Sequence, residues 1–361
     1  MTLQRRIRVL VVEDSPVIQA LLAHVIGEDP RLEVAGVASS GEQALRMAER
    51  LGPDVISLDI RLPGIDGFEV TNRIMRQQPT PIVVVASDVR DLDIPMRALQ
   101  AGALAVVEKP GSVARADYQT LARHLCTQLV IMSQVKVIRR RISPRTGRAG
   151  TDGTAPGSDG FAPSAPQPGG RRYRALGIVA STGGPAALVK VLKDLPRDFA
   201  VPVFIVQHIG APFVEGFASW LGSVCPLPVS LAEQGGSPRA GHVYVAPGDR
   251  HLRVEGGAMR LVEGEMVCGQ RPSGEVLFQS LGTSYGPAGI GVLLTGMGED
   301  GARGLLAMRQ AGAYTIAEHS STAVIHSMPG TAVRLGGAVE ELPVDRVAPR
   351  LLQLIRGEGV A

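Results

Sequence analysis

Short apolar segments alternate with amphipathic segments along most of this chain. The first of them, Ile7–Val12, is apolar except for Arg8, and such a run is typical of a strand buried on both faces of a parallel sheet. The same pattern predicts strands over residues 34–37, 54–58, 82–85 and 105–107, and helical spacing predicts helices over residues 17–26 and 41–51. Alternating strands and helices predict a doubly wound parallel sheet in the first part of the chain.

A second alternation of this kind begins at Tyr173. Leu176–Ala180 predicts a strand, and Pro185 opens a helical pattern directly after a Ser-Thr-Gly-Gly turn. The other predicted elements are strands over residues 201–206, 290–294 and 314–317, helices over residues 186–194, 213–224 and 276–285 and from residue 302, and a hairpin-like region over residues 243–262. This order predicts another doubly wound α/β domain, with a mostly parallel sheet and an antiparallel hairpin.

Residues 143–170 separate the two alternations, and they are rich in Gly, Pro, Ser and Ala. Such a segment cannot bury enough apolar surface to offset the entropy lost on ordering, so it is predicted to be a flexible linker. Helical spacing precedes it from residue 117. We therefore expect a first domain over residues 1–125, a helix extension and basic linker over residues 126–172, and a second domain over residues 173–361.

Composition bears mainly on where the protein works. No apolar stretch is long enough to span a membrane, and the N-terminus lacks the apolar core of a signal peptide. The three cysteines, Cys126, Cys225 and Cys268, are far apart, which favours free thiols in the cytoplasm. The net charge of +3 is concentrated around the linker, where no recognition helix or aromatic platform accompanies it. We expect neither nucleic-acid binding nor direct membrane insertion.

Charged residues follow three predicted strands of the first domain. Glu13 and Asp14 follow the first strand, Asp59 the third and Lys109 the fifth. Because parallel strands end at the same edge of a sheet, these side chains are expected to converge. Three carboxylates repel one another unless a cation joins them, and oxygen ligands suit Mg²⁺, while a lysine can accompany a phosphoryl group. Each residue taken alone leaves a simpler role open, as a helix cap or a loop residue.

Together with the segment Leu62–Gly67, these residues resemble the receiver domain of two-component response regulators. The resemblance implies a flavodoxin-like fold and phosphorylation of Asp59 by a histidine kinase. It also implies that Glu13, Asp14 and Asp59 hold Mg²⁺ and that Lys109 contacts the phosphoryl group.

Two positions depart from the receiver pattern. Ala86 ends the fourth predicted strand where the family usually has Ser or Thr, and Val106 stands where an aromatic residue is common. Ser87 is one residue further, and side chains of a strand alternate between faces, so its hydroxyl is expected to point away from the phosphorylation site. Both departures concern the switch that reports phosphorylation.

Reactive side chains also follow three predicted strands of the second domain. Ser181, His208 and Asp300 have the types needed for a nucleophile, its base and the carboxylate that orients the base. Glycines on both sides of Met297 allow its N–H to point at a developing oxyanion. Individually, Ser181 can also be a cap or phosphate ligand, His208 a structural residue and Asp300 a helix cap. The remaining histidines lack metal-ligand spacing, so no cofactor is expected in this domain.

Several short motifs of the second domain resemble the catalytic domain of the bacterial chemoreceptor methylesterases of the CheB family. They are Ala180–Pro185, Gln207–His208, Ala246–His251, Arg271–Ser273, Leu294–Gly298, Asp300–Gly301 and Met328–Pro329. The resemblance implies a protein-glutamate methylesterase that acts in sensory adaptation, with possible activity as a protein-glutamine glutaminase and with methyl-accepting chemoreceptors as substrates.

In that resemblance each site residue has a role. Ser181 attacks the ester, His208 takes the proton and Asp300 holds the imidazole, while Met297 lies at the oxyanion and Thr182 beside the nucleophile. Departures from the family pattern occur at Val179, Gly269, Glu299, Thr322 and His326. A receiver-controlled esterase or a binding module of another signalling array remains the alternative interpretation.

Overall fold

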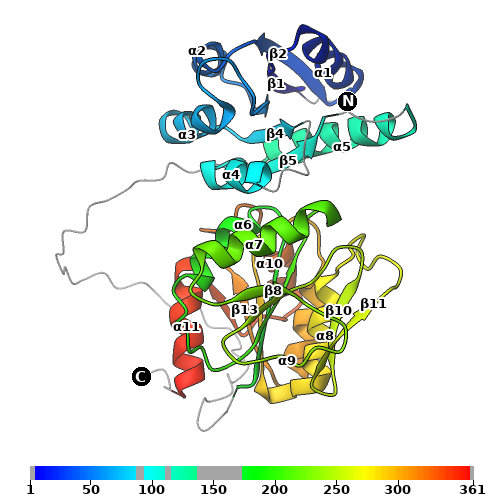
Figure 1. The fold of residues 1–361 in the computed structure, drawn as a ribbon, viewed down its shortest axis with the longest axis vertical. Helices are drawn as coiled ribbons and strands as arrows, with labels where there is room; N and C mark the ends of the chain where they lie inside the picture. Colours follow the sequence, from blue (N-terminus) through cyan, green and yellow to red (C-terminus); the bar gives the residue numbers. More distant parts are fainter. Residues whose placement is uncertain (1–4, 87–92, 110–114, 136–172, 358–361) are drawn as a thin grey trace, which may run out of the picture.

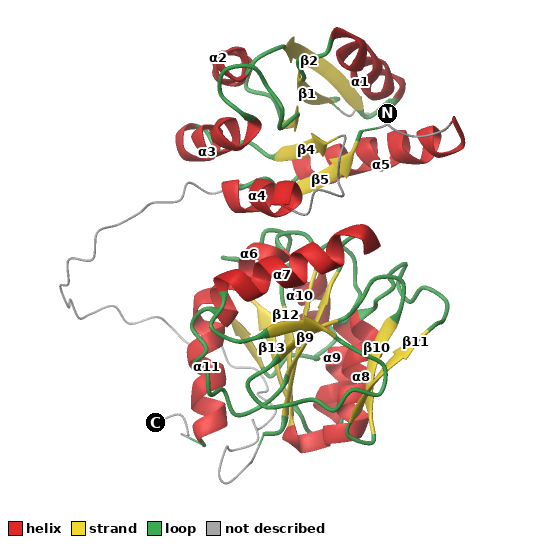
Figure 2. Ribbon diagram, viewed as in Figure 1, coloured by secondary structure: helices red, strands yellow, loops and turns green. Residues whose placement is uncertain are grey.

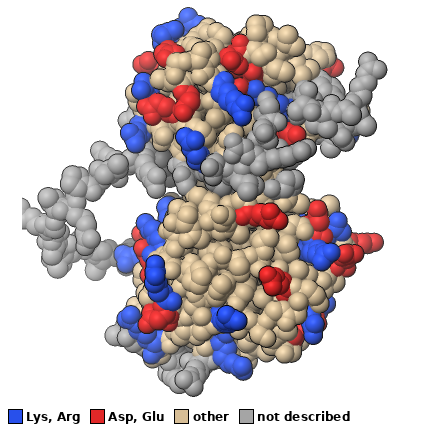
Figure 3. Space-filling model, viewed as in Figure 1, with Lys and Arg blue, Asp and Glu red and all other residues tan. Residues whose placement is uncertain are grey.

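The structure is a computed structural model of the whole chain that describes residues 5–86, 93–109, 115–135 and 173–357. Two α/β domains (Figure 1, and as a space-filling model in Figure 3) lie on either side of the 136–172 segment, which falls outside the described residues, as does Ser87. The domain boundaries at residues 125 and 172 stay predictions. Helix α5, Arg115–Ser133, runs across the first of them, and its residues Leu129 and Met132 are buried in the core of the first domain.

The first domain is a five-stranded parallel sheet, as predicted, and its strands lie in the order β2-β1-β3-β4-β5. Its strands are β1 Ile7–Val12, β2 Leu32–Ala38, β3 Val55–Leu58, β4 Ile82–Ala86 and β5 Ala105–Glu108, and its first four helices are α1 Pro16–Glu28, α2 Gly41–Leu51, α3 Gly67–Gln77 and α4 Asp93–Ala101. Apolar residues of α1 and α5 bury one face of the sheet, and those of α2, α3 and α4 bury the other.

Local sequence explains how the loops at the carboxyl edge of this sheet are held. Pro16 occupies the first turn of α1, where its missing N–H costs no hydrogen bond. The Asp66 carboxylate caps α3 by accepting a hydrogen bond of 2.8 Å from Glu69 N–H. Gly67 follows because a side chain there would meet the carbonyl oxygen of Asp59. The loop between β3 and α3 therefore lies directly against Asp59.

The second domain has a seven-stranded sheet in the order β14-β13-β12-β6-β7-β9-β8, with parallel pairing throughout. The strands are β6 Ala175–Ala180, β7 Val203–Gln207, β8 Val229–Leu231, β9 Val243–Val245, β12 Gly289–Leu293, β13 Tyr314–Glu318 and β14 Glu340–Leu342, and β10 His251–Glu255 pairs with β11 Ala258–Val262 as a separate antiparallel hairpin. The helices are α6 Gly184–Leu192, α7 Val214–Val224, α8 Gly274–Tyr285, α9 Ala302–Gln310, α10 Ser327–Arg334 and α11 Val344–Arg356, with short 3₁₀ turns at Ala211–Phe213 and Gly286–Ala288.

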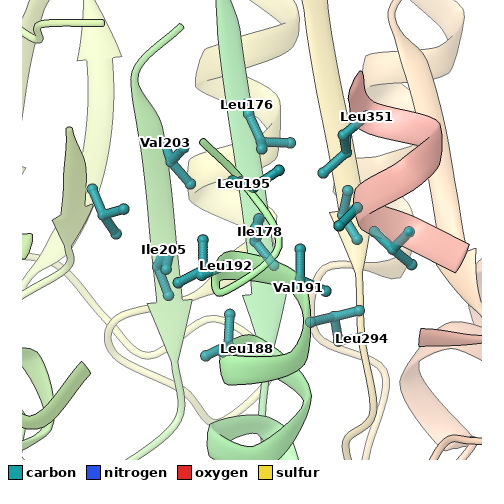
Figure 4. Packing of buried hydrophobic residues seen from close by; sticks show 14 of the residues in the cluster. Leu176, Ile178, Leu188, Val191, Leu192, Leu195, Val203, Ile205, Leu294 and Leu351 are labelled. Atoms are coloured by element: carbon teal, nitrogen blue, oxygen red, sulfur yellow. The ribbon is translucent and has the colours of Figure 1, made fainter. Parts of the chain in front are cut away.

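Helices cover both faces of this sheet, as the doubly wound prediction requires (Figure 2). Leu188 and Val191 of α6 pack over Ile178 of β6 and Ile205 of β7, and Leu351 of α11 joins the same cluster (Figure 4). Helices α8, α9 and α10 and the β10-β11 hairpin form the core on the opposite face. The sheet is thus buried on both sides, which accounts for the continuously apolar strands.

One element was assigned wrongly from the sequence. Val243–Val245 is predicted within the hairpin-like region, but it is β9, a parallel strand between β7 and β8 of the main sheet. Only β10 and β11 form the hairpin. A run of three apolar residues does not reveal its partner, because its pairing depends on contacts far away in sequence.

The two domains contact each other through α4 of the first domain and α6 and α7 of the second (Figure 1). Leu99 of α4 packs against the second-domain core, and Phe213, in the 3₁₀ turn directly before α7, packs against the core of the first domain. Val324 and Ile325, in the loop after β13, also pack against the first domain. The contact surface therefore includes loops at the carboxyl edge of the second sheet.

Candidate functional sites

The second sheet changes the direction of its winding between β6 and β12. From β6 the chain builds outward through β7 to β9 and β8, and it then returns to β12 and continues to β13 and β14 on the other side. In such sheets a crevice forms where the carboxyl ends of the two central strands diverge. Ser181 follows β6, His208 follows the adjacent β7, and Asp300 lies in the loop after β12.

The turn after β6 holds Ser181 against the loop after β12. Ser181 N–H donates to the Thr295 carbonyl at 3.0 Å, and Gly184 N–H closes the turn by donating to the Ser181 carbonyl at 2.8 Å. Gly183 has a φ of 78°, a left-handed angle that favours glycine. A Cβ atom on Gly296 would lie 2.7 Å from Ser181 Cβ, so a glycine is needed for the two loops to approach.

His208 and Asp300 form a buried pair. His208 Nε2 lies 2.8 Å from Asp300 Oδ2, with side-chain exposures of 6% and 2%. The other ring nitrogen, Nδ1, is buried and has no hydrogen-bond partner among the described residues. Ala180 is paired with Gln207, so Ser181 and His208 are the next residues on neighbouring strands. The unpaired Nδ1 is therefore the nitrogen available to a serine hydroxyl.

The N-terminus of α8 holds the Asp300 carboxylate. Ser273 Oγ donates to Asp300 Oδ1 and Gly274 N–H donates to Oδ2, both at 2.6 Å. Burial alone would raise the pKa of Asp300, but hydrogen bonds from His208, Ser273 and Gly274 outweigh it and hold the pKa below its usual value. The carboxylate thus stays ionised beside the imidazole.

Two supporting residues were not assigned a role from the sequence. His251 is buried, its Nδ1 accepts from Ser273 N–H at 3.2 Å and its Nε2 lies 2.9 Å from the Glu265 carbonyl, so it fixes the residue that donates to Asp300. Gln207 Nε2 donates to the carbonyls of Ser181 at 2.9 Å and His208 at 3.0 Å. Their positions inside short motifs were the available signal, but the contacts depend on tertiary structure.

Two backbone N–H groups flank the turn that holds Ser181, one in the next residue, Thr182, and one in Met297, which follows Gly296. In the part of the chain that the structure describes, neither Thr182 N–H nor Met297 N–H makes a hydrogen bond. Thr295, in the loop after β12, connects the loops after β6 and β13. Its Oγ1 donates to the Thr182 carbonyl at 2.9 Å and accepts from Ile325 N–H at 2.9 Å. Met297 as a whole is 45% exposed, and it directly follows Gly296, the residue that packs against Ser181.

A fully buried carboxyl, Glu318, ends β13 behind these loops. Its Oε2 accepts from Thr295 N–H at 2.8 Å and its Oε1 accepts from Thr322 Oγ1 at 2.9 Å. Burial raises the pKa of Glu318, while those two donors oppose the rise. Thr322, one of the departures from the family pattern, thus helps to anchor the loop beside the candidate nucleophile.

The first domain gathers its charged strand-end residues as expected. Carboxylate oxygens of Glu13, Asp14 and Asp59 lie within 4.8 Å of one another. Lys109 Nζ lies 2.8 Å from Asp59 and 2.7 Å from Glu13. A pocket of about 300 Å³ opens above them, and Ala86 is part of its lining. The three carboxylates offer only oxygen donors and face an open space, so they fit Mg²⁺.

Burial and pairing affect the charges of this cluster differently. Burial raises the pKa of Glu13, and the charge of Asp59 adds to the rise against the effect of Lys109. Burial would lower the pKa of Lys109, but its hydrogen bonds with Asp59 and Glu13 raise the pKa above the usual value. Two carboxylates therefore share one ammonium group, which leaves an excess of negative charge for a cation.

The folds and sites define a receiver-type domain joined to an α/β domain with serine, histidine and aspartate at its strand ends. Comparison with known sequences agrees. Residues 176–351 match the family profile described as CheB methylesterase, and residues 9–117 match that of the response regulator receiver domain. The chain is 49% identical over 357 residues to protein-glutamate methylesterase/protein-glutamine glutaminase 2 of Paramagnetospirillum magneticum, covering 98% of this chain and 99% of the relative.

Two further proteins are similar to this chain. Protein-glutamate methylesterase/protein-glutamine glutaminase 1 of Syntrophus aciditrophicus is 44% identical over 96% of this chain and 98% of its own. The crystal structure of the Thermotoga maritima CheB methylesterase catalytic domain is 33% identical, covers 50% of this chain and 98% of its own, and has a TM-score of 0.49. From the nearly full-length relatives, this chain belongs to the CheB methylesterase family. In the described ranges, no helix has the length and apolar character needed to cross a membrane.

Proposed function

We propose that this protein hydrolyses glutamyl methyl esters on chemoreceptors and is controlled by phosphorylation of its receiver domain. The observation that carries the proposal is the buried His208–Asp300 pair, which leaves Nδ1 of His208 unpaired next to the strand end that bears Ser181. A nucleophile, a base and an orienting carboxylate are the groups that acyl transfer requires.

In the proposed reaction Ser181 Oγ attacks the ester carbonyl and its proton passes to Nδ1 of His208. Asp300 keeps the proton on Nε2 and stabilises the imidazolium, as its lowered pKa allows. The N–H groups of Thr182 and Met297 stabilise the oxyanion. His208 then protonates the leaving methoxide, so methanol departs, and a water activated by His208 hydrolyses the acyl-enzyme to restore Ser181 and leave a glutamate.

The same steps on a glutamine side chain would release ammonia. An amine leaves less readily than methanol, so this glutaminase reaction depends more strongly on His208 as a general acid. The printed names of the relatives include both activities, which supports assigning both to this chain.

In the receiver, we assign phosphorylation to Asp59, with a histidine kinase as the phosphodonor. Glu13, Asp14 and Asp59 would hold Mg²⁺, which when bound neutralises charge on the phosphoryl oxygens. Lys109 lies 2.8 Å from Asp59 and would move its ammonium group onto the phosphoryl group.

Contact between the domains supports inhibition by the unphosphorylated receiver. Val324 packs against the receiver core and lies 2.6 Å from where a Cβ of Gly183 would be, two residues from Ser181. The docked receiver would thus cover the loop that flanks the nucleophile. Phosphorylation would activate the enzyme by favouring separation.

The decisive experiment measures methanol release from methylated chemoreceptors by the full chain, with and without a small phosphodonor. We expect release that rises with the phosphodonor, and a fragment of residues 173–361 should exceed the unphosphorylated full chain. Absence of methanol release by both proteins would refute the esterase assignment, whereas equal activity of both would refute only the inhibitory docking. We assign this protein to the cytoplasm, because its cysteines are free thiols and a histidine kinase and the receptor segments that it modifies would be reached there.

A further inference from the structure

A second group of potential ligands lies at the N-terminus of α8, on the side of Asp300 that the proposed reaction does not use. Cys268, Glu275 and Asp300 each offer one ligand atom, and these atoms lie within 4.8 Å of one another. The group combines a thiol with two carboxylates. It therefore differs in chemistry from the all-oxygen cluster of the receiver.

Glu275 provides an independent sign that something binds here. The residue is 4% exposed, and its Oε1 accepts from Arg303 N–H at 3.0 Å. Its Oε2 is buried and has no hydrogen-bond partner among the described residues. A buried carboxylate oxygen seldom lacks a partner, because its desolvation then goes uncompensated.

Cys268 is the only exposed residue of the three. It lies in a turn closed by two hydrogen bonds between the backbones of Val267 and Gln270, at 3.0 and 3.1 Å. A divalent cation bound among these groups would stabilise the Cys268 thiolate.

We propose that Cys268, Glu275 and Asp300 form a Zn²⁺ site. A thiolate with two carboxylates suits a borderline-soft cation such as Zn²⁺ and not the hard cation Mg²⁺. Three protein ligands leave the fourth tetrahedral position to water. The three ligand atoms lie within 4.8 Å of one another, so one ion can be placed among them.

The site is connected to catalysis through Asp300. That carboxylate already accepts from His208, Ser273, Gly274 and Glu275, which occupies the roughly four acceptor positions of a carboxylate. A cation that binds Asp300 must displace a donor, and the His208 ring is the donor that does not belong to the fixed start of α8. Zn²⁺ would therefore inhibit the esterase, an expectation that rests on the proposed function.

Binding is tested on the full chain, purified without a metal-affinity tag and kept in excess Mg²⁺ to fill the receiver. Zn²⁺ is titrated in competition with a chromophoric chelator. We expect one tight site, weakened about 100-fold in Cys268→Ser and in Glu275→Gln. Cys225→Ser is the matched control and should bind as the unmodified chain does. Cd²⁺ should give thiolate charge-transfer absorption that is lost only in Cys268→Ser. Equal Zn²⁺ affinity in all four proteins overturns the site.

Inhibition is tested by the ratio of methanol release without and with Zn²⁺ for each protein. Zn²⁺ should lower methanol release at least about tenfold in the unmodified chain and in Cys225→Ser, and a chelator should restore it. In Cys268→Ser, Zn²⁺ should lower methanol release little. Tight Zn²⁺ binding with an unchanged ratio overturns the connection through Asp300. A chain that binds Zn²⁺ but releases no methanol under any condition contradicts the proposed function and leaves the metal site supported.

Discussion

The receiver and the esterase domain place their candidate sites at the same point of two similar sheets, yet they treat buried carboxylates differently. In the receiver, Glu13 and Asp59 follow the adjacent strands β1 and β3 and share the ammonium of Lys109. In the esterase domain, Asp300 follows β12 and is held by N–H and O–H donors at the start of α8. The pKa of Glu13 is consequently raised by burial, whereas the pKa of Asp300 is lowered by its donors despite burial.

The difference matches what each site is proposed to do. Crowded carboxylates with too little positive charge attract a cation and a phosphoryl group that brings one with it. A carboxylate saturated by fixed dipoles stays ionised without any cation and can orient an imidazole. The same sheet geometry therefore provides a candidate ion-binding pocket in one domain and a hydrogen-bonded candidate catalytic group in the other.

The largest effect should come from removing the nucleophile on one side of this comparison. Ser181→Ala should reduce methanol release by roughly 10⁴-fold or more, because a triad works as a unit. Its counterpart, Asp59→Asn, should keep the unstimulated rate and lose only the response to a phosphodonor. Methanol release is the measurement for both, and near-normal turnover by Ser181→Ala would end the triad assignment.

A smaller loss is expected from weakening the dipoles that hold Asp300. Ser273→Ala removes both the hydroxyl donor to Asp300 and the cap of α8, which accepts from Glu275 N–H at 3.1 Å. We expect kcat to fall about tenfold to 100-fold, by analogy with other orienting groups, and stability to fall by about 1 kcal/mol. Ser273→Thr, which keeps a hydroxyl, should restore most of kcat. Equal losses in both variants would show that packing, not the donor, matters.

A change of about tenfold in the activation ratio is expected from placing a hydroxyl at position 86 of the receiver. Ala86 lines the pocket around Asp59 without a hydroxyl, so phosphorylation there would lack one charge-assisted hydrogen bond worth roughly 1.5–3 kcal/mol. If about 1.4 kcal/mol of that reaches the domain contact, Ala86→Thr should enlarge the ratio of phosphorylated to unphosphorylated activity about tenfold. Ser87→Ala should change this ratio little. An unchanged ratio in Ala86→Thr with a collapse in Ser87→Ala would assign the switch to Ser87.

The smallest expected effect is on stability, and its dependence on pH should differ between variants of Glu13 and Asp300. A raised pKa means that Glu13 favours the folded state at low pH and loses that contribution as pH rises through its folded value. Glu13→Gln should therefore raise the urea midpoint at pH 7 and have little effect below about pH 4. Asp300 has a lowered pKa, so its stabilisation is present at pH 7 and is lost as pH falls. Asp300→Asn should lower the midpoint at pH 7, and a rise would contradict the comparison.

Much of the fold could be predicted because local signals agreed with each other. Strands β1 to β7, β12 and β13 were predicted to within a few residues, since burial on both faces requires uninterrupted apolar side chains. Helix α2 was predicted with its exact bounds, where Ser40 caps its first turn and Gly52 takes a left-handed angle after its last. The role of Val243–Val245 could not be predicted, because strand pairing is a long-range property.

By itself, the sequence determined which residues are candidates for the two sites and that they stand at strand ends, because motifs and hydrophobic periodicity are local. Only the tertiary structure decided that Nε2 of His208 faces Asp300, and that Ser273 and His251 hold Asp300. It alone also brought Cys268 to Glu275. These contacts join residues from separate strands, loops and helices, and such distances are set by how whole elements pack rather than by any stretch of the chain.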